Sequence, residues 1–244
     1  MVLWLVCMIN AKNLEWATFL YNAMGEDTSY IDASIKVRRD LKKDSPGNAI
    51  VDFLNHWRMR VSSTNVSTWI NEKYNSKVKT LLEVLPNSLL ELDLSDTHAR
   101  ERITDLYNCL DEIHSINDTG VSKILHIIKP DLFVMWDNEI RMYYLKNQKI
   151  TYGPSAYMFF LGKMQIIARS LRDEDGMISS KLSLNLKTLY EGNLKNITEA
   201  SKIEAVKRTI HFLETEGKPI TKFLDEYNWI VITKQVEIPP TWYP

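Results

Sequence analysis

The sequence predicts an all-α protein, and three observations lead to that prediction. Only eight glycines and eight prolines interrupt 244 residues, so long stretches contain no strong helix breaker. Apolar residues recur at helical spacing along most of these stretches. No internal repeat or low-complexity segment is visible. We therefore expect eight to eleven helices joined by short connections.

The predicted helices each carry an apolar face and stop at a residue that ends helices. The first, near 14–24, stops at Gly25, and the late one near 203–213 is stopped by Gly217 and Pro219. The other predicted apolar faces lie in 49–57, 69–85, 99–113, 154–171 and 220–227. Residues around 184 fit helix and strand equally, and the segment near 231 has strand composition, so a short β segment near the C-terminus stays open.

The size of the chain suits one large helical domain. With 28.4 kDa there is enough material for a sizeable core, and no glycine-, serine- or charge-rich run marks a linker. We expect a single all-helical domain over 1–244. The alternative is two lobes in which helices from both ends of the chain interleave.

Charge and cysteine content exclude several classes of protein. Thirty basic and 31 acidic residues give a net charge of −1, so no broad positive field indicates nucleic acid, although a local patch remains compatible with this total. Cys7 and Cys109 have neither disulfide nor zinc-site spacing. No glycine-rich nucleotide loop or metal-binding motif is present. We expect no cofactor and no metal.

The opening residues MVLWLVCMIN are apolar but too short to span a bilayer. They lack the positive start and the cleavage site of a secretory leader. We expect a cytoplasmic, reduced, intracellular protein without a membrane partner. Protein partners are not indicated by the sequence.

One segment, TGVSKILHIIKPDLFVMWDNEIR at 119–141, combines helix signals with isolated polar residues. We predict a helix over 99–114, a tight turn at 117–121 and a short helix over 122–128. Pro130 ends the short helix because its ring removes a donor and restricts the preceding residue.

After Pro130, the residues DLFVMW predict an extended, buried crossing, and DNEIR starts the next helix. Asp137 is expected at the N-cap of that helix, with Glu139 in its first turn. A lysine, Lys123, and an aspartate, Asp137, thus stand at the two ends of a buried hairpin.

This order of helix, glycine turn, helix, buried loop and aspartate resembles the helix-hairpin-helix DNA glycosylase superfamily over residues 99–145. The turn reads NDTGV, with Gly120 alone, where the family pattern is L-P-G-[VI]-G. The resemblance implies a two-lobed helical fold. It also implies that Lys123 is the nucleophile that attacks the sugar C1′ in lyase members, and that Asp137 is the assisting carboxylate.

The resemblance further implies a nucleic-acid contact at the hairpin and a pocket for the extruded base. Gly120, Val121, Ser122 and His126 are the candidate nucleic-acid contacts, since backbone N–H groups at a helix N-terminus hold phosphates. Trp136, Trp57 and Phe53 are the candidate walls of the base pocket, and Tyr143 and Tyr152 are weaker ones.

The expected function is a DNA glycosylase-like enzyme that cleaves the N-glycosidic bond of a modified base, with an optional lyase step. Its partner is nucleic acid, DNA before RNA, or a modified nucleoside. The alternative is a non-catalytic nucleic-acid-binding or protein-interaction module.

Each candidate residue also has a purely structural interpretation. Asp137 is then a helix cap, Lys123 a solvent-facing residue of a first helical turn, and His126 a packed histidine. Gly120 is expected to serve a turn with positive φ in either case.

Overall fold

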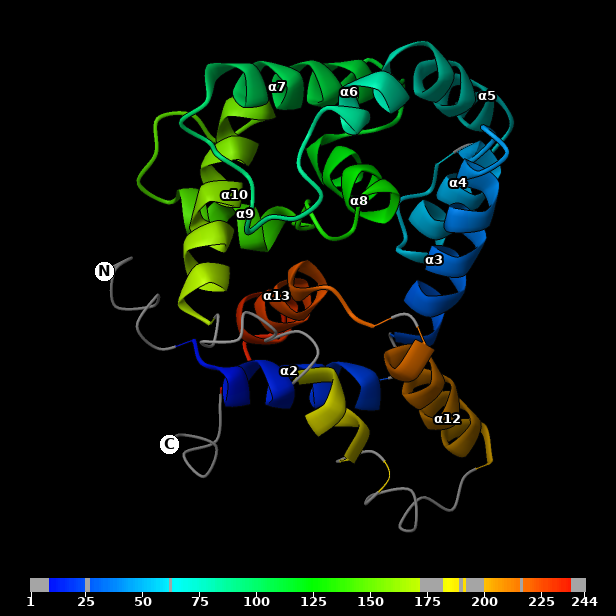
Figure 1. The fold of residues 1–244 in the computed structure, drawn as a ribbon, viewed down its shortest axis with the longest axis vertical. Helices are drawn as coiled ribbons and strands as arrows, with labels where there is room; N and C mark the ends of the chain where they lie inside the picture. Colours follow the sequence, from blue (N-terminus) through cyan, green and yellow to red (C-terminus); the bar gives the residue numbers. More distant parts are fainter. Residues whose placement is uncertain are drawn as a thin grey trace. The chain divides into compact units, whose positions relative to one another are not determined.

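The computed structural model describes residues 9–24, 27–61, 63–171, 182–188, 191, 200–215 and 217–237. Within these residues the secondary structure is helical and contains no β-strand (Figure 1), which confirms the all-α prediction. Residues 1–8 with Cys7, the predicted loop at 173–176 and the last seven residues lie outside this description.

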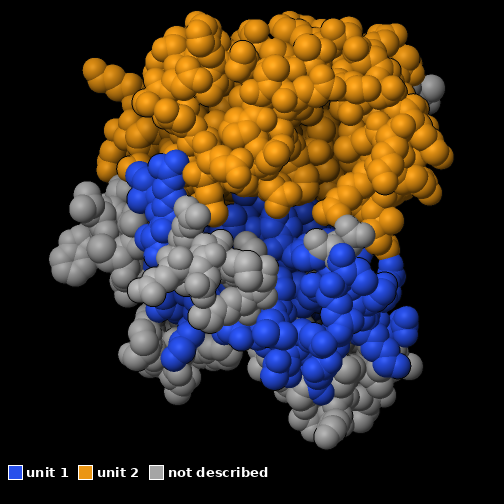
Figure 2. All heavy atoms as spheres, in the orientation of Figure 1, with its two compact units in different colours: residues 1–31, 166–244 blue, residues 32–165 orange. Residues whose placement is uncertain are grey.

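The chain divides into two compact units, coloured separately in Figure 2. Unit 2 is the continuous stretch from Asp32 to Gln165. Unit 1 is formed by both ends of the chain, Met1–Ile31 and Ile166–Pro244. The divisions fall inside two helices, α3 (Asp27–Leu41) and α10 (Gly153–Ser170).

Unit 2 holds the predicted hairpin and the helices packed on it. Besides parts of α3 and α10, its helices are α4 (Gly47–His56), α5 (Ser63–Lys73), η1 (Tyr74–Val78), α6 (Lys79–Glu83), α7 (Thr97–Asp111), α8 (Asp118–Ile128) and α9 (Asn138–Leu145). Helix α4 packs against α5 and α8, and α7 packs against α5, η1, α6 and α8. The hairpin of α7 and α8 is therefore supported by helices from earlier in the chain.

The helices α5, η1 and α6 follow one another without a break, and η1 is a π-helix in which the Lys79 N–H bonds the Tyr74 carbonyl. Such a wider turn shifts the buried face of a helix relative to a regular α-helix. Trp69, predicted on the apolar face, is 37% exposed, whereas Ile70 and Val78 are buried. Helical spacing predicts both Trp69 and Ile70 on the apolar face, but only Ile70 is on the buried side of α5.

The core of unit 2 near the hairpin is aromatic. The ring of Trp136 lies 5.0 Å from that of Tyr157 in an edge arrangement and 5.3 Å from that of Phe160. Tyr107 contacts Tyr157 as well, with ring centroids 5.5 Å apart. These geometries are favourable for aromatic pairs and add to the burial of a large apolar area.

Unit 1 contains α2 (Ala11–Ala23), α12 (Ala200–Thr215), α13 (Ile220–Asn228), η2 (Trp229–Thr233) and a helical segment at 182–188. Helix α2 packs on α13 and η2. The segment at 182–188, ambiguous in sequence, is helical. The strand-like segment near 231 forms the π-helix η2 instead of a β segment, because Trp229 packs edge-on against Tyr21, 5.2 Å away, and Ile230 is fully buried.

Every residue of α13 is buried, and the helix carries an internal charge cluster. The Lys218 ammonium lies 2.8 Å from Glu226 Oε1, and the Lys222 ammonium lies 2.8 Å from Asp225 Oδ2 and 3.5 Å from Glu226 Oε1. The side chains of Lys218, Lys222 and Glu226 are all 0% exposed. The Lys222 ammonium also lies 4.3 Å from the centre of the Tyr21 ring. Each lysine of the cluster is thus compensated by an opposite charge inside the protein.

Candidate functional site

The second helix of the hairpin begins earlier than predicted. Asn117 is its N-cap, and its side-chain oxygen accepts the Gly120 N–H at 3.0 Å. Residues 118–121, expected in a tight turn, form the first turn of α8. Lys123 consequently lies in the second turn of α8 and not, as expected, in the first.

Gly120 has a role other than the predicted positive-φ turn, because it is a helical residue of α8. A Cβ atom at this position would lie 2.9 Å from Met59 Cε and 3.0 Å from Ile116 Cγ2. The missing side chain allows the loop between α4 and α5 to approach α8. Since Asn117 accepts the Gly120 N–H, this donor is not directed at a phosphate as we expected.

The loop between α4 and α5 carries Trp57 and Met59 and has an unusual backbone. Arg58 and Arg60 both adopt left-handed φ values, of 61° and 50°, which cost energy for residues other than glycine. The Asn55 side chain holds the loop closed by accepting the Val61 N–H at 2.6 Å and donating to the Val61 carbonyl at 3.0 Å. Arg58 and Arg60 are exposed on this loop.

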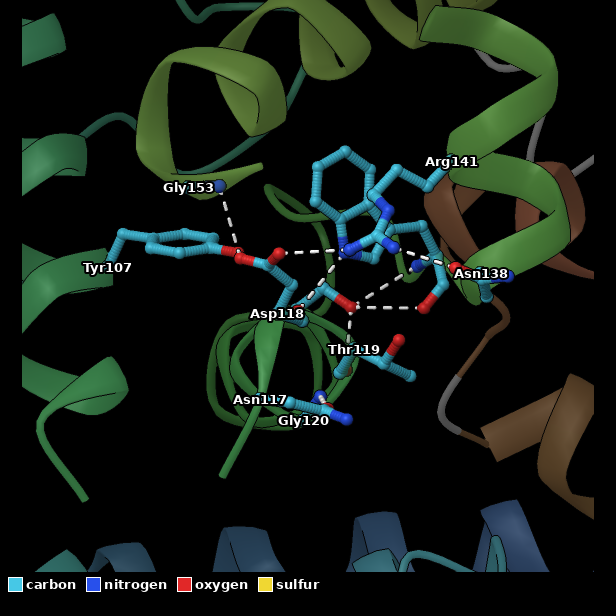
Figure 3. Close-up of polar contacts among 10 residues, drawn as sticks. Tyr107, Asn117, Asp118, Thr119, Gly120, Asn138, Arg141 and Gly153 are labelled. Atoms are coloured by element: carbon cyan, nitrogen blue, oxygen red, sulfur yellow. Dashed lines mark hydrogen bonds and ion pairs between the residues drawn. The ribbon is translucent and has the colours of Figure 1, made fainter. Parts of the chain in front are cut away.

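Asp118, the first residue of α8, joins four helices (Figure 3). Its carboxylate accepts hydrogen bonds from the Tyr107 hydroxyl of α7, from Arg141 Nη1 of α9 at 2.9 Å and from the Gly153 N–H of α10 at 3.1 Å. Burial and the bond to Asp118 raise the pKa of Tyr107, so this hydroxyl remains a donor. A carboxylate in the first turn also suits the helix dipole.

The ion pair between Asp118 and Arg141 is largely shielded from water, with side-chain exposures of 13% and 8%. Arg141 Nη2 additionally donates to the Asn138 side chain at 2.7 Å (Figure 3). Sequence reasoning did not select this pair. Two features of the sequence could have indicated the pair. An acidic residue, Asp118, directly follows Asn117, and Arg141 lies four positions after Asp137.

The loop at 131–136, which is buried from Leu132 onward, explains two of the predicted nucleic-acid contacts. Its residues Leu132–Trp136 are at most 1% exposed, so their backbone groups need partners inside the protein. His126 Nδ1 lies 2.6 Å from the Phe133 carbonyl oxygen, and the Tyr157 hydroxyl donates to the Val134 carbonyl at 2.9 Å. His126 therefore acts as a packed histidine that satisfies the loop.

Ser122 makes the contact that joins α8 to the end of this loop. Its hydroxyl oxygen accepts the Trp136 N–H at 3.3 Å. Its single proton is donated to the Thr119 carbonyl at 2.8 Å, and the Trp136 carbonyl lies farther away, at 3.3 Å. Ser122 and Val121 are 0% exposed, and Gly120 is also buried. The four candidate nucleic-acid contacts, Gly120, Val121, Ser122 and His126, are thus interior residues, which corrects their expected surface position.

The candidate nucleophile Lys123 lies in a nearly closed, aromatic setting. The residue is 6% exposed, and its ammonium lies 4.8 Å from the centre of the Trp57 ring. The Trp57 and Phe53 rings are 5.7 Å apart, with Phe53 buried and Trp57 half-buried. The structure therefore brings together Lys123 and two of the three predicted pocket walls, and it corrects the expectation of a solvent-facing lysine.

The third predicted wall, Trp136, occupies a different place. It is 1% exposed, packs against the aromatic core and donates its indole N–H to the Asp118 carbonyl at 3.1 Å. It has no exposed face for a base, which corrects its predicted role. Of the weaker candidates, Tyr143 and Tyr152 are 42% and 61% exposed.

Asp137 is the N-cap of α9, as predicted. Its backbone is extended, and its Oδ1 accepts the Ile140 N–H at 2.8 Å. The residue remains half-buried. Ser122 contacts Trp136. Lys123 follows Ser122 and Asp137 follows Trp136, so the two candidate residues belong to backbone segments that lie side by side.

Among the described residues, no cluster of histidine, cysteine or acidic side chains could hold a metal ion. None of the helices in this part of the chain has the length and apolar character needed to cross a membrane. Comparisons with protein-family models, with curated proteins and with solved structures found no match.

Proposed function

We propose that this chain cleaves the N-glycosidic bond of a modified base in DNA or a related nucleoside, with Asp137 and Lys123 as the acting side chains. The observation that carries the proposal is the Ser122–Trp136 contact, which draws together the two segments from which these side chains arise. The resemblance to helix-hairpin-helix glycosylases supports the same assignment.

Asp137 suits the role of the assisting carboxylate. Breaking the bond between C1′ and the base nitrogen leaves positive charge on the sugar, and a nearby carboxylate stabilises that charge. The same carboxylate can take a proton from an attacking water, whose oxygen then bonds C1′ while the base departs with the electron pair and a proton. The hydrogen bond from Ile140 uses one acceptor position of the Asp137 carboxylate. A carboxylate has two oxygens and about four acceptor positions, so this cap bond alone does not fill it.

Lys123 suits an optional nucleophilic route. Lysines that act as nucleophiles generally lie in desolvated surroundings, and Lys123 is 6% exposed beside Trp57. Its neutral amine would bond C1′ as the base leaves, and loss of a proton and ring opening would give a Schiff base that permits strand cleavage. The amine contributes the electron pair, so no further reactant is needed.

The alternative is a module without chemistry, in which Asp137 serves only as a cap. The hydrogen bond from the Ile140 N–H to Asp137 Oδ1, at 2.8 Å, is what a helix cap requires. The start of α8, however, is poorly suited to hold a phosphate, because Asn117 takes the Gly120 N–H and the Asp118 carboxylate already occupies the positive end of the helix. The alternative therefore favours protein contacts over nucleic acid at the hairpin.

A base-release screen of the wild-type protein tests the proposal. The panel contains duplex and single-stranded oligonucleotides with oxidised, deaminated, alkylated and abasic sites, together with the matching nucleosides. We expect release of at least one base at a rate that rises in proportion to enzyme concentration. Absence of release across the panel, from protein shown to be folded by circular dichroism, would contradict the proposal.

A further inference from the structure

A long stretch of the sequence contains basic residues and no acidic ones. Residues 140–172 include no aspartate or glutamate, although 31 acidic residues in 244 would place about four in a stretch of this length. The same stretch has six basic residues, Arg141, Lys146, Lys149, Lys163, Arg169 and Arg172. A nearly neutral chain thus has a local positive segment, the type of feature that attracts polyanions.

Part of this segment, on α9 and the loop that leads into α10, consists of exposed residues. Figure 1 shows where these two helices lie in the fold. Four large apolar or aromatic side chains are unusually exposed there: Met142 at 48%, Tyr143 at 42%, Ile150 at 57% and Tyr152 at 61%. Lys146 and Lys149 are exposed between them. We call these six residues the α9 platform.

Neither lysine of the platform forms an ion pair with an acidic side chain in the part of the chain that the structure describes. The ion pairs found there involve other cations, for example Lys79 with Asp44 at 2.8 Å. Exposed amides, Asn147 and Gln148, lie between the two lysines in the sequence. The platform therefore offers positive charge and hydrogen-bonding groups together with aromatic rings.

The Tyr152 ring is held in place by the Asp118 network. Arg141 Cζ lies 4.1 Å from the centre of the Tyr152 ring, and the same guanidinium is ion-paired with Asp118. The next residue, Gly153, donates its N–H to Asp118 and has a φ of 74°, which favours glycine. Tyr152 is thus fixed against a buried arginine while most of its surface remains open.

The Tyr143 ring is supported in a similar way. It packs edge-on against Tyr144, 5.3 Å away, and Tyr144 in turn packs against Phe160 at 5.5 Å. Tyr144 and Phe160 are buried. Rings anchored on a buried layer lose little conformational freedom when a ligand stacks on them.

We infer that the α9 platform binds an unpaired segment of nucleic acid, with Tyr143 and Tyr152 stacking on bases and Lys146 and Lys149 contacting phosphates. Sequence-tolerant binding of single strands combines aromatic stacking with positive charge in this way. The amides of Asn147 and Gln148 oppose insertion into lipid, so a nucleic-acid strand fits the surface better than a membrane does.

The platform is suitably placed for a substrate of the proposed enzyme. Helix α9 has eight residues and is about 12 Å long, with Asp137 at its start. A strand bound along α9 would bring a nucleotide a short distance from the platform to Asp137. In this respect the inference rests on the proposed function, and it specifies a polynucleotide with an unpaired segment rather than a free nucleoside.

Fluorescence anisotropy with a labelled 20-nucleotide single strand and the matching duplex tests the inference. We expect tighter binding of the single strand. Tyr152→Ala should weaken this binding about tenfold because one stacked base is lost, whereas Tyr152→Phe should retain it. Tyr143→Ala gives an independent measurement if Tyr152→Ala lowers thermal stability.

The charge of the platform is tested by a salt titration. The double variant Lys146→Gln, Lys149→Gln should reduce the slope of log affinity against log salt by about 1.4, since two phosphate contacts are lost. Lys79→Gln is the matched control, because this half-buried lysine of α6 pairs with Asp44 in the turn after α3, and its slope should equal that of the wild type.

Any of three binding results would overturn the inference. They are no binding of the single strand at low salt, equal losses in the platform and control variants, or platform-dependent binding of phosphatidylserine vesicles without binding of oligonucleotides. Strand binding without base release would leave the inference standing and remove the proposed function. Base release from oligonucleotides at the same rate in the wild type and in Tyr152→Ala would remove the inference and leave the proposed function standing.

Discussion

The hydroxyl oxygen of Ser122 lies 3.3 Å from both the backbone nitrogen and the backbone oxygen of Trp136. This fully buried side chain accepts the Trp136 N–H and donates its one proton to the Thr119 carbonyl, 2.8 Å away, so it joins α8 to the end of the buried loop. The residues that follow, Lys123 and Asp137, are the candidate catalytic pair. The contact makes structural stability and the geometry of the proposed site depend on the same atom.

Ser122→Ala should lower the free energy of unfolding by about 1–3 kcal/mol, because the buried Trp136 N–H loses its hydrogen-bond acceptor. Urea denaturation measures the change. Ser95→Ala is the control, since Ser95 donates to Asp93 at an exposed position and its loss should change stability little. Equal effects of the two variants would contradict the role assigned to Ser122.

Substitution by alanine should lower stability at Gly47 but change it little at Gly120. At Gly47 a Cβ would lie 2.1 Å from the Ser67 carbonyl oxygen, so α4 and α5 would have to separate, at a cost of about 1–3 kcal/mol or more. At Gly120 the nearest atom is Met59 Cε, the end of a flexible side chain that can move, and Ile116 Cγ2, at 3.0 Å, would have to give way by a few tenths of an ångström at most. The gain in helix propensity, about 1 kcal/mol, should then bring Gly120→Ala close to wild-type stability.

Thermal denaturation of both glycine variants, followed by circular dichroism, provides the comparison. Gly47→Ala should have the clearly lower midpoint. A larger loss in Gly120→Ala would mean that the contact of Met59 with α8 is rigid.

In unit 1, Glu226→Gln should lower the free energy of unfolding by about 3–5 kcal/mol, because Lys218 and Lys222 would lose a buried negative charge. Glu214→Gln removes an exposed partner of Lys187 and should leave stability unchanged within error. Chemical denaturation of the two variants decides the matter. Similar stability of both would show that the cluster on α13 is not energetically coupled.

Lys123 should form a covalent adduct with abasic oligonucleotides in the presence of borohydride, if the lyase route operates. The adduct should disappear in Lys123→Gln and persist in Lys79→Gln, which removes a lysine outside the site. Peptide mapping by mass spectrometry identifies the modified residue. An adduct that persists in Lys123→Gln would assign the nucleophile to another amine.

The sequence was sufficient for the helical class of the fold and for the cap at Asp137, since both depend on local signals. Apolar spacing predicts helices, and an aspartate after a buried run predicts an N-cap. The start of α8 was predicted about four residues late, because Asn117 was not recognised as a cap. Gly120 suggested a turn, although its missing side chain serves close packing.

Residues whose roles depend on contacts distant in sequence could not be assigned in advance. His126, Ser122 and Trp136 were predicted to form a binding surface. Each instead makes hydrogen bonds inside the protein, in or beside the buried loop. The Asp118–Arg141 pair links residues 23 positions apart. The strand-like composition near 231 was overridden by burial of Ile230 and by packing of Trp229 on Tyr21 in unit 1.

The central claim is that Asp137 contributes its charge to chemistry in addition to capping α9. Asn is as good an N-cap as Asp, so Asp137→Asn should keep the wild-type stability, whereas Asp137→Ala should lose about 1 kcal/mol. Once a substrate is identified by the base-release screen, single-turnover release by Asp137→Asn is the decisive measurement. We expect the rate to fall by about 10²- to 10⁴-fold without loss of stability or binding. Release by Asp137→Asn at the wild-type rate would contradict the account and leave Asp137 as a helix cap alone.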